Sequence, residues 1–182
     1  MVYLFLANGF EEVEALAPLD LLRRAGVDVA TVAVGTAGKP VTGAHGIKVE
    51  ADIRENDADL EKIDAVILPG GMPGASNLDA SKTVDLALAA AAKKGAIIAA
   101  ICAAPLVPGK RGYLSGKRAI CFPGFEGYLS GAIISKGERV VRDGNAITAV
   151  GMGAAYGFGL ELVAALAGAE KANAIAASAK IK

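Results

Sequence analysis

Cys102 is the residue of this chain best suited to covalent chemistry. It directly follows an apolar run, residues 96–101, that is typical of a buried strand. The segment Ala103-Ala104-Pro105 is able to open a helix, because proline is tolerated in a first turn. The N–H groups and dipole of a helix N-terminus favour thiolate over thiol. The sequence predicts a nucleophilic or oxidisable thiol at a strand-to-helix elbow, with a buried structural cysteine as the alternative.

Glu14 is the second candidate. Acids at the start of a helix ordinarily just complement the helix dipole, and this interpretation suffices for Glu11 and Glu12. Pro18, four residues after Glu14, cannot donate to the Glu14 carbonyl, so we expect a distorted helix there. A carboxyl that abuts a thiolate has a raised pKa and donates a hydrogen bond to the sulfur. Glu14 is therefore either a partner of Cys102 or one more acid in the first turn.

Glycine-rich segments offer bare backbone N–H groups. The segment 69–75, Pro-Gly-Gly-Met-Pro-Gly-Ala, could form an oxyanion hole opposite Cys102, although glycine pairs after strands are also ordinary turns. Two other patterns fail as nucleotide loops. After Gly151 and Gly153 the next glycine is one residue too late, and segment 35–40 is too short and has proline where a magnesium-binding hydroxyl belongs. No cofactor is expected.

His45 is the only histidine, and it lies in a Gly-Ala-His-Gly turn that is typical of a solvated loop. With Cys102 and Cys121 it has the ligand types of some zinc centres, but the spacing matches no recognised motif, so we expect no metal. Cys121 stands in a β-type run and is expected in the core or in a pocket wall.

Strand and helix patterns alternate along the chain, and the apolar strands are nearly continuous. This predicts an α/β fold: a mostly parallel sheet covered on both faces, a three-layer αβα sandwich. Expected strands are 2–7, 27–34, 47–53, 65–68, 96–101, 118–122, 139–142 and 146–150, and expected helices are 11–25, 81–94, 159–167 and 170–179. Ligands of such sheets bind beyond the carboxyl ends of the strands, which here are followed by loops 8–14, 69–75, 102–105 and 151–157.

Composition excludes several classes of function. The 182 residues, 53% hydrophobic and 21% charged, fit one domain spanning residues 1–182. Nineteen basic and nineteen acidic residues balance without a basic run, so nucleic acid is not expected as a partner. The longest uncharged stretches are shorter than the about 20 apolar residues of a membrane span. No export signal is evident and two cysteines make no disulfide framework, so we expect a cytoplasmic protein with free thiols.

Three ordered motifs resemble the ThiJ/PfpI superfamily, and more narrowly the branch of the Parkinson-associated deglycase, often called DJ-one. They are segments 8–14, 68–75 and 99–105, and the resemblance runs from Val2 to about Ala177. It implies a flavodoxin-like sandwich that is usually a homodimer. It also implies a reactive Cys102 beside a protonated Glu14, with the backbone of Gly70, Gly71 and Ala103 completing the site.

The activities credited to such proteins differ in kind. They include glutathione-independent glyoxalase action on methylglyoxal, deglycation, redox sensing under oxidative stress and chaperone function, and similar chains are also linked to thiazole monophosphate biosynthesis. The resemblance therefore implies a small aldehyde, or its adduct, as substrate without fixing the reaction.

This chain departs from the pattern at its pocket. Phe122 stands before a proline where related enzymes often have histidine, so the general base would be Glu14. An Arg-Gly-Pro-Gly-Thr loop corresponds to Val-Gly-Met-Gly-Ala at 150–154, which makes a more apolar pocket with His45, Phe122 and Met152 in its wall. Ala103 replaces the histidine of the peptidase branch and argues against proteolysis.

Two hypotheses follow. In the first, Cys102 attacks an aldehyde, N–H groups of Gly71 and Ala103 stabilise the oxyanion, and Glu14 shuttles a proton towards lactate. In the second, the protein is a redox-responsive module without turnover, whose Cys102 oxidises to a sulfinate held by Glu14.

Overall fold

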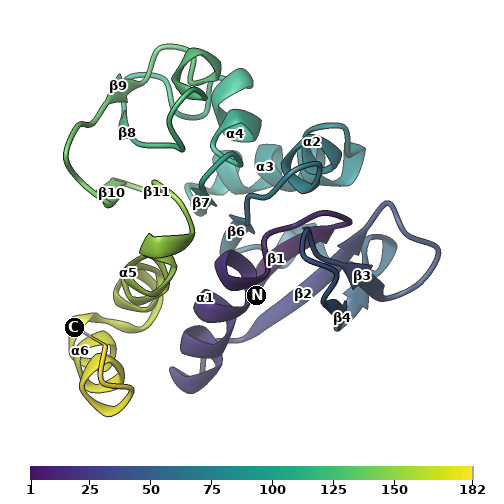
Figure 1. Cartoon of the computed structure of the whole chain (residues 1–182), viewed down its shortest axis with the longest axis horizontal. Helices are drawn as coiled ribbons and strands as arrows, with labels where there is room; N and C mark the ends of the chain where they lie inside the picture. Colours follow the sequence, from purple (N-terminus) through teal and green to yellow (C-terminus); the bar gives the residue numbers. More distant parts are fainter. Residues whose placement is uncertain (182) are drawn as a thin grey trace.

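The computed structural model describes residues 1–181 and is built around a seven-stranded sheet (Figure 1). Its order is β10-β11-β7-β6-β1-β2-β5, and every neighbouring pair is parallel except β10 with β11. The strands are β1 (Val2–Ala7), β2 (Val29–Val34), β5 (Ile53–Arg54), β6 (Ala65–Leu68), β7 (Ile97–Ile101), β10 (Val140–Asp143) and β11 (Ala146–Ala149). The predicted mostly parallel α/β sheet is therefore confirmed.

Helices cover both faces of the sheet. On one face lie α1 (Glu12–Arg24), α5 (Ala155–Ala167) and α6 (Ala169–Ser178), and on the other α2 (Gly74–Asp79), α3 (Lys82–Lys94) and α4 (Leu106–Lys110) (Figure 1). Successive side chains of β1 alternate between the faces, so Leu4 and Leu6 join the core under α1 and α5 while Tyr3 and Phe5 join the core under α3. Because both faces of β1 are buried, its sequence is apolar throughout.

Capping residues fix where the long helices begin and end. The Ser81 hydroxyl accepts a hydrogen bond from the Val84 N–H at the start of α3, and Gly95 ends that helix in the left-handed conformation with φ of 68°. The Glu11 side chain accepts from the Glu14 N–H in the same way at the start of α1. The chain therefore specifies the orientation of the first turn of α1, which carries Glu14.

The smaller elements differ from the predictions. The strand expected at 47–53 is divided into β4 (Lys48–Glu50), which forms a hairpin with β3 (Pro40–Thr42), and β5. The strand expected at 118–122 is reduced to β8 (Arg118–Ala119), paired with β9 (Ile133–Ile134). The remaining elements are short 3-10 turns: η1 (Glu55–Asp57), η2 (Leu60–Lys62), η3 (Glu126–Tyr128) and η4 (Met152–Ala154). Among the described residues, no helix has the length and apolar character needed to cross a membrane.

Candidate active site

Four adjacent parallel strands bring the candidate residues together. β11, β7, β6 and β1 are neighbours that run in the same direction, so the segments that follow them meet at one edge of the sheet. These segments are the loops 8–14, 69–75, 102–105 and 151–157 that the sequence predicted at this edge. They carry Glu14, the glycines of 69–75 and Cys102. The ligand-binding edge expected of a doubly wound sheet is thus where these residues gather.

The backbone of Cys102 is strained. Its φ is +65°, a conformation uncommon for a residue with a side chain and one that costs about 1–3 kcal/mol. Two hydrogen bonds hold it: the Cys102 N–H donates to the Ala149 carbonyl at 2.9 Å, and the Phe122 N–H donates to the Cys102 carbonyl at 2.8 Å. The surrounding fold therefore holds the Cys102 backbone in this turn at the end of β7.

The prediction that a helix begins directly after Cys102 is wrong. Residues 102–105 form turns, and the five-residue α4 begins at Leu106. The thiol thus sits at a strand-to-turn elbow, and a helix that short and that distant contributes little dipole to it.

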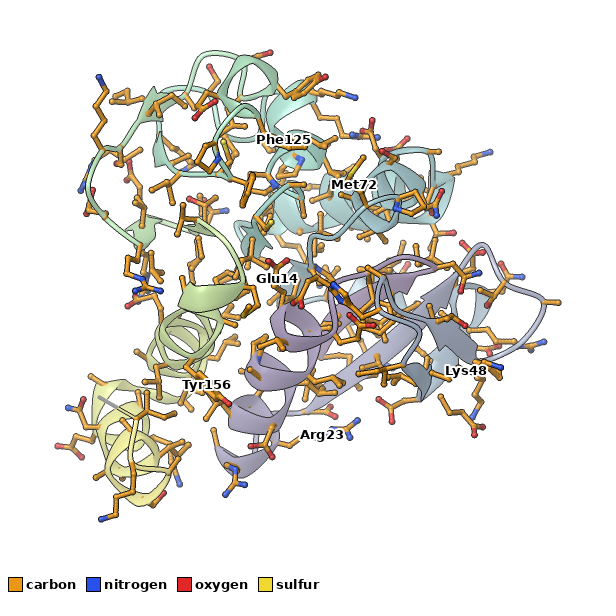
Figure 2. The ribbon with its side chains drawn as sticks, viewed as in Figure 1. Glu14, Arg23, Lys48, Met72, Phe125 and Tyr156 are labelled. Carbon is orange, nitrogen blue, oxygen red and sulfur yellow. The ribbon has the colours of Figure 1, made fainter. Side chains whose placement is uncertain are left out.

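Glu14, labelled at the start of α1 in Figure 2, is fully buried. Its side chain lies against the Cys102 thiol. Its Oε2 atom accepts a hydrogen bond from the Gly70 N–H at 2.9 Å. Its Oε1 atom is buried and makes no hydrogen bond with residues 1–181. The carboxyl is therefore anchored through Oε2, and its other oxygen is left without a hydrogen bond beside the thiol.

Burial and mutual contact shift the pKa values of both side chains. Burial raises the pKa of Glu14 to about 7, against the lowering effect of its hydrogen bond with Cys102. Burial and the neighbouring Glu14 carboxylate raise the pKa of the Cys102 thiol to about 12. Between these two values the pair holds one proton. The expectation that the elbow lowers the thiol pKa is wrong, because burial and an adjacent acid outweigh the backbone N–H groups.

Backbone N–H groups surround the sulfur. Hydrogen bonds from the backbone of Ala103 and Gly71 lower the pKa of the Cys102 thiol, against the larger effect of burial. Gly70, grouped with these donors in the sequence prediction, has its N–H engaged by Glu14 instead. A Cβ atom on Gly70 would lie 2.6 Å from Glu14 Oε2 and 2.7 Å from Cys102 Cβ, so only glycine fits between the two reactive side chains.

An apolar rim lies beside the thiol. A Cβ atom on Gly151 would lie 3.4 Å from Phe122 Cδ2 and 3.9 Å from Cys102 Sγ, so both border the same small space. Phe122 is 48% exposed, and Met152, next to Gly151, is 53% exposed. Residues 120–122 are held here because the Ile120 N–H donates to Thr148 Oγ1 on β11. No sequence signal pointed to that hydroxyl.

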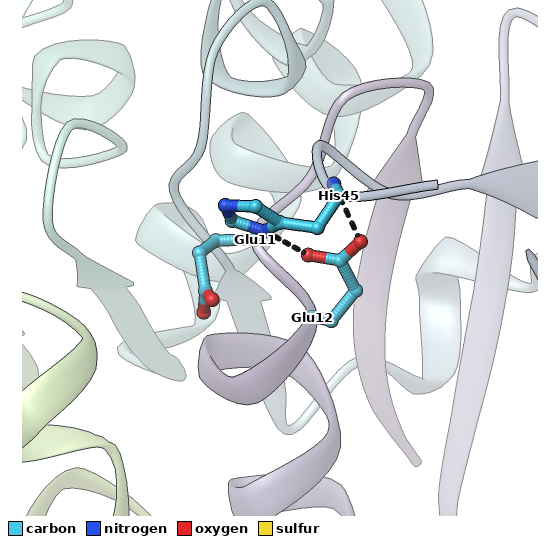
Figure 3. A group of neighbouring side chains, drawn as sticks. All are labelled: Glu11, Glu12 and His45. Atoms are coloured by element: carbon cyan, nitrogen blue, oxygen red, sulfur yellow. Dashed lines mark hydrogen bonds and ion pairs between the residues drawn. The ribbon is translucent and has the colours of Figure 1, made fainter. Parts of the chain in front are cut away.

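His45 pairs with Glu12 (Figure 3). The buried Glu12 carboxylate accepts from the His45 backbone N–H through Oε1 and contacts His45 Nδ1 through Oε2, both at 2.8 Å. Burial alone would raise the pKa of Glu12, but its hydrogen bonds with His45 lower it. The contact with Glu12 in turn raises the pKa of the exposed His45. The ion pair fastens the β3–β4 hairpin to the start of α1. A place for His45 in the wall of the Cys102 pocket stays a prediction.

Cys121 lies in the core, one of the two positions expected for it. It is 3% exposed and packs with Leu114, Leu129 and Ala146, and burial raises the pKa of its thiol to about 11. Both cysteines are free thiols.

Comparisons with known proteins agree with these observations. A model of the DJ-1/PfpI family matches residues 1–165. Protein dj-1beta of Drosophila melanogaster is 38% identical over 172 residues, covering 94% of this chain and 91% of the relative. The glutathione-independent glyoxalase DJR-1.2 of Caenorhabditis elegans is 31% identical over 165 residues, covering 91% of this chain and 87% of the relative. The crystal structure of Drosophila melanogaster DJ-1beta matches with a TM-score of 0.92 and 35% identity, covering 100% of this chain and 97% of that one. The resemblance in the three motifs and the flavodoxin-like three-layer arrangement are thereby confirmed.

Proposed function

Because the chain belongs to the DJ-1/PfpI family, we propose that it is a cysteine-dependent, glutathione-independent glyoxalase that acts on methylglyoxal-like aldehydes or their adducts. The observation that carries the proposal is the contact between Cys102 and the buried Glu14. A nucleophile and a base of raised pKa in contact are the groups that addition to a carbonyl requires. The name of the nematode relative supports this reaction.

The first step transfers the thiol proton of Cys102 to Glu14. As sulfur attacks the aldehyde carbon, the thiol proton passes to the Glu14 carboxylate, and the carbonyl oxygen becomes an alkoxide. The N–H groups of Gly71 and Ala103 already donate towards the sulfur and are close to that oxygen when it forms. A thiolate in the resting enzyme is therefore unnecessary, because Glu14, with a pKa of about 7, accepts the proton during attack.

The later steps conserve electrons within the substrate. The alkoxide takes up the proton on Glu14 to give a hemithioacetal. Glu14 then removes the hydrogen on the sulfur-bearing carbon as a proton and returns it to the neighbouring ketone carbon, while the hydroxyl proton of the hemithioacetal passes to the ketone oxygen. The first carbon is thereby oxidised to the thioester carbonyl and the second reduced to a secondary alcohol. The product is a thioester of a 2-hydroxy acid. Water hydrolyses the thioester, which releases lactate from methylglyoxal and restores the thiol, so no external oxidant, metal or cofactor takes part.

The test is a glutathione-free assay in which methylglyoxal consumption and lactate release are followed together. The proposal requires equal amounts of aldehyde lost and lactate formed over many turnovers. Aldehyde loss that stops at one equivalent of protein would mean that Cys102 merely traps the aldehyde. A cytoplasmic setting, expected for a chain with free thiols, stays a prediction.

The second candidate is a redox-responsive role. It is favoured by Glu14 Oε1, which is buried and has no hydrogen-bond partner among the described residues. Because the Glu14 carboxyl lies against the thiol, its protonated form is able to donate to an oxidised sulfur. Two equivalents of peroxide oxidise the thiol to a sulfinic acid with release of two waters.

We expect mild peroxide to add two oxygens to the Cys102 peptide while Cys121, at 3% exposure, stays unmodified. Intact mass and peptide mapping measure this, and Glu14→Ala should weaken the preference for the sulfinate. A loss of two hydrogens, with both cysteines blocked to alkylation, would contradict the prediction and indicate a disulfide.

A homodimer is also part of the proposal. Val13, Ile47 and Tyr156 are exposed large apolar side chains that line one groove of about 330 Å³ beside α1, and Tyr156 reaches out from α5 towards it (Figure 2). Light scattering at micromolar concentration should give twice the 18.3 kDa chain mass, and Ile47→Glu should give the chain mass by placing a charge in the contact. Leu86→Glu, on the outer side of α3, should remain dimeric. A wild-type monomer would reject the dimer.

A further inference from the structure

We propose that Phe122, Gly151 and Met152 form a binding slot for the substituent of the aldehyde, and that this slot selects flat, apolar substituents over charged ones. The inference rests on the proposed glyoxalase function and names the substrate class of that site. It concerns which α-oxoaldehydes react fastest, not whether Cys102 reacts.

The slot is located by the space where a side chain on Gly151 would lie. A carbon at the place of a Gly151 Cβ atom would be in van der Waals contact with the Phe122 ring at 3.4 Å and with Cys102 Sγ at 3.9 Å. A substrate that is bonded to Sγ and projects towards Gly151 therefore comes close to the ring. Because Gly151 has no side chain, this space is left for the substrate.

The polarity of the slot favours an uncharged group. Phe122 and Met152 are each about half exposed, so their apolar surfaces are available for a ligand to cover. Covering apolar surface stabilises binding by roughly 25 cal/mol per Å². The charged group closest in effect to the Cys102 thiol is the Glu14 carboxylate. Its negative charge repels a substrate whose substituent is an anion.

The thickness of the slot favours a flat group. The Gly151 Cβ position is within 3.9 Å of both the Phe122 ring and Cys102 Sγ, so we infer that a planar ring against Phe122 fits better than a bulkier group. The structure thus assigns phenylglyoxal-like aldehydes as better substrates than methylglyoxal, and glyoxylate, which carries a carboxylate in place of the apolar group, as a poor one.

Steady-state kinetics on these three aldehydes test the slot. We expect kcat/KM for phenylglyoxal to exceed that for methylglyoxal on the order of tenfold after correction for the free, unhydrated aldehyde. Phe122→Ala should reduce the ratio to about one, since the stacking surface is lost. Gly151→Ala should lower kcat/KM for phenylglyoxal more than for methylglyoxal, because its methyl group occupies the slot at ordinary contact distances. Leu86→Ala, which removes an equally exposed apolar side chain from α3, is the matched control and should leave the ratio unchanged.

Alkylation of Cys102 gives a readout that does not need turnover. Iodoacetanilide, iodoacetamide and iodoacetate share a leaving group and differ in carrying a phenyl ring, a neutral amide or a carboxylate. Relative to free cysteine, Cys102 should react about tenfold faster with iodoacetanilide than with iodoacetamide and more slowly with iodoacetate, and Phe122→Ala should remove the phenyl preference.

The two readouts separate failure of the slot from failure of the function. Phenyl-selective alkylation that depends on Phe122, without aldehyde turnover, would support the slot and reject the glyoxalase. Turnover with aldehyde ratios and alkylation rates that Phe122→Ala leaves unchanged would overturn the slot while the glyoxalase stands. Faster reaction of wild-type Cys102 with iodoacetate than with iodoacetanilide would overturn it as well.

Discussion

Cys102→Ser should lower kcat for methylglyoxal by at least about 1000-fold, because loss of a nucleophile removes the covalent route entirely. A serine hydroxyl is far less acidic than a thiol, and a Glu14 carboxylate with a pKa of about 7 cannot deprotonate it efficiently. The substitution changes one atom, so the turn at φ +65° and its two backbone hydrogen bonds should persist. Lactate release in the glutathione-free assay measures the effect.

Cys121→Ala is the matched control for loss of a thiol. Cys121 lies in a core cluster that includes neither Glu14 nor Cys102. Its replacement should therefore cost roughly 1 kcal/mol of stability and leave kcat within about twofold of wild type. Retention of a tenth or more of the wild-type kcat in Cys102→Ser would exclude the covalent mechanism.

Glu14→Gln should lower kcat by about 100- to 10,000-fold, the usual contribution of a positioned acid or base. The amide keeps the shape of the carboxyl and can still accept from Gly70, but it cannot carry the proton between the two substrate carbons. In the wild type, kcat/KM should rise as the pH increases through about 7, where the buried carboxyl ionises, and this rise should be absent from the residual activity of the variant. Wild-type activity in Glu14→Gln would contradict the role of Glu14 as the base and would assign it only a structural hydrogen bond.

The same substitution should increase stability above neutral pH. The pKa of Glu14 is raised from 4.5 to about 7, so the folded chain binds an extra proton between these values, and the free energy of unfolding falls as the pH rises through that window. Ionised Glu14 thus costs the wild type on the order of 2–3 kcal/mol above pH 7. Urea titrations at pH 5 and pH 8 should show that loss in the wild type and not in Glu14→Gln, whereas Glu14→Ala, which leaves a cavity, should be destabilised at both.

Where local sequence signals decide the structure, the sequence predicted it well. The strands 2–7 and 65–68 were predicted to the residue, because both are buried on both faces and bounded by turn residues. The helix expected at 81–94 is α3 with Ser81 as its cap and Gly95 as its stop. The contact between Cys102 and Glu14 followed from the family motifs and from the rule that loops at one sheet edge meet.

Where distant segments decide the structure, the sequence misled. The predicted helix starts at 159, whereas α5 begins at Ala155 and includes Gly157, which was predicted to lie in a loop. Gly159 lies where α1 crosses so closely that a Cβ there would be 2.8 Å from Pro18 Cα. Helix α2 was not predicted, because Gly74 at its start resembles a turn residue. A Cβ atom on Gly74 would lie 2.5 Å from the Phe10 backbone nitrogen, so glycine is needed there for close packing. The raised pKa of Cys102 depends on burial, which the motif does not encode.

The glycines that border the reactive pair divide the site into positions that tolerate change and positions that do not. A Cβ atom added to Gly70, Gly71 or Gly74 would lie less than 3 Å from neighbouring atoms. A Cβ atom added to Gly151 would make only ordinary van der Waals contacts. Most random substitutions at the first group would destroy the nucleophile along with the fold around it. Directed evolution of new substrate ranges should therefore proceed almost entirely through 122, 151 and 152, and a library restricted to those codons should retain a high fraction of folded, reactive clones.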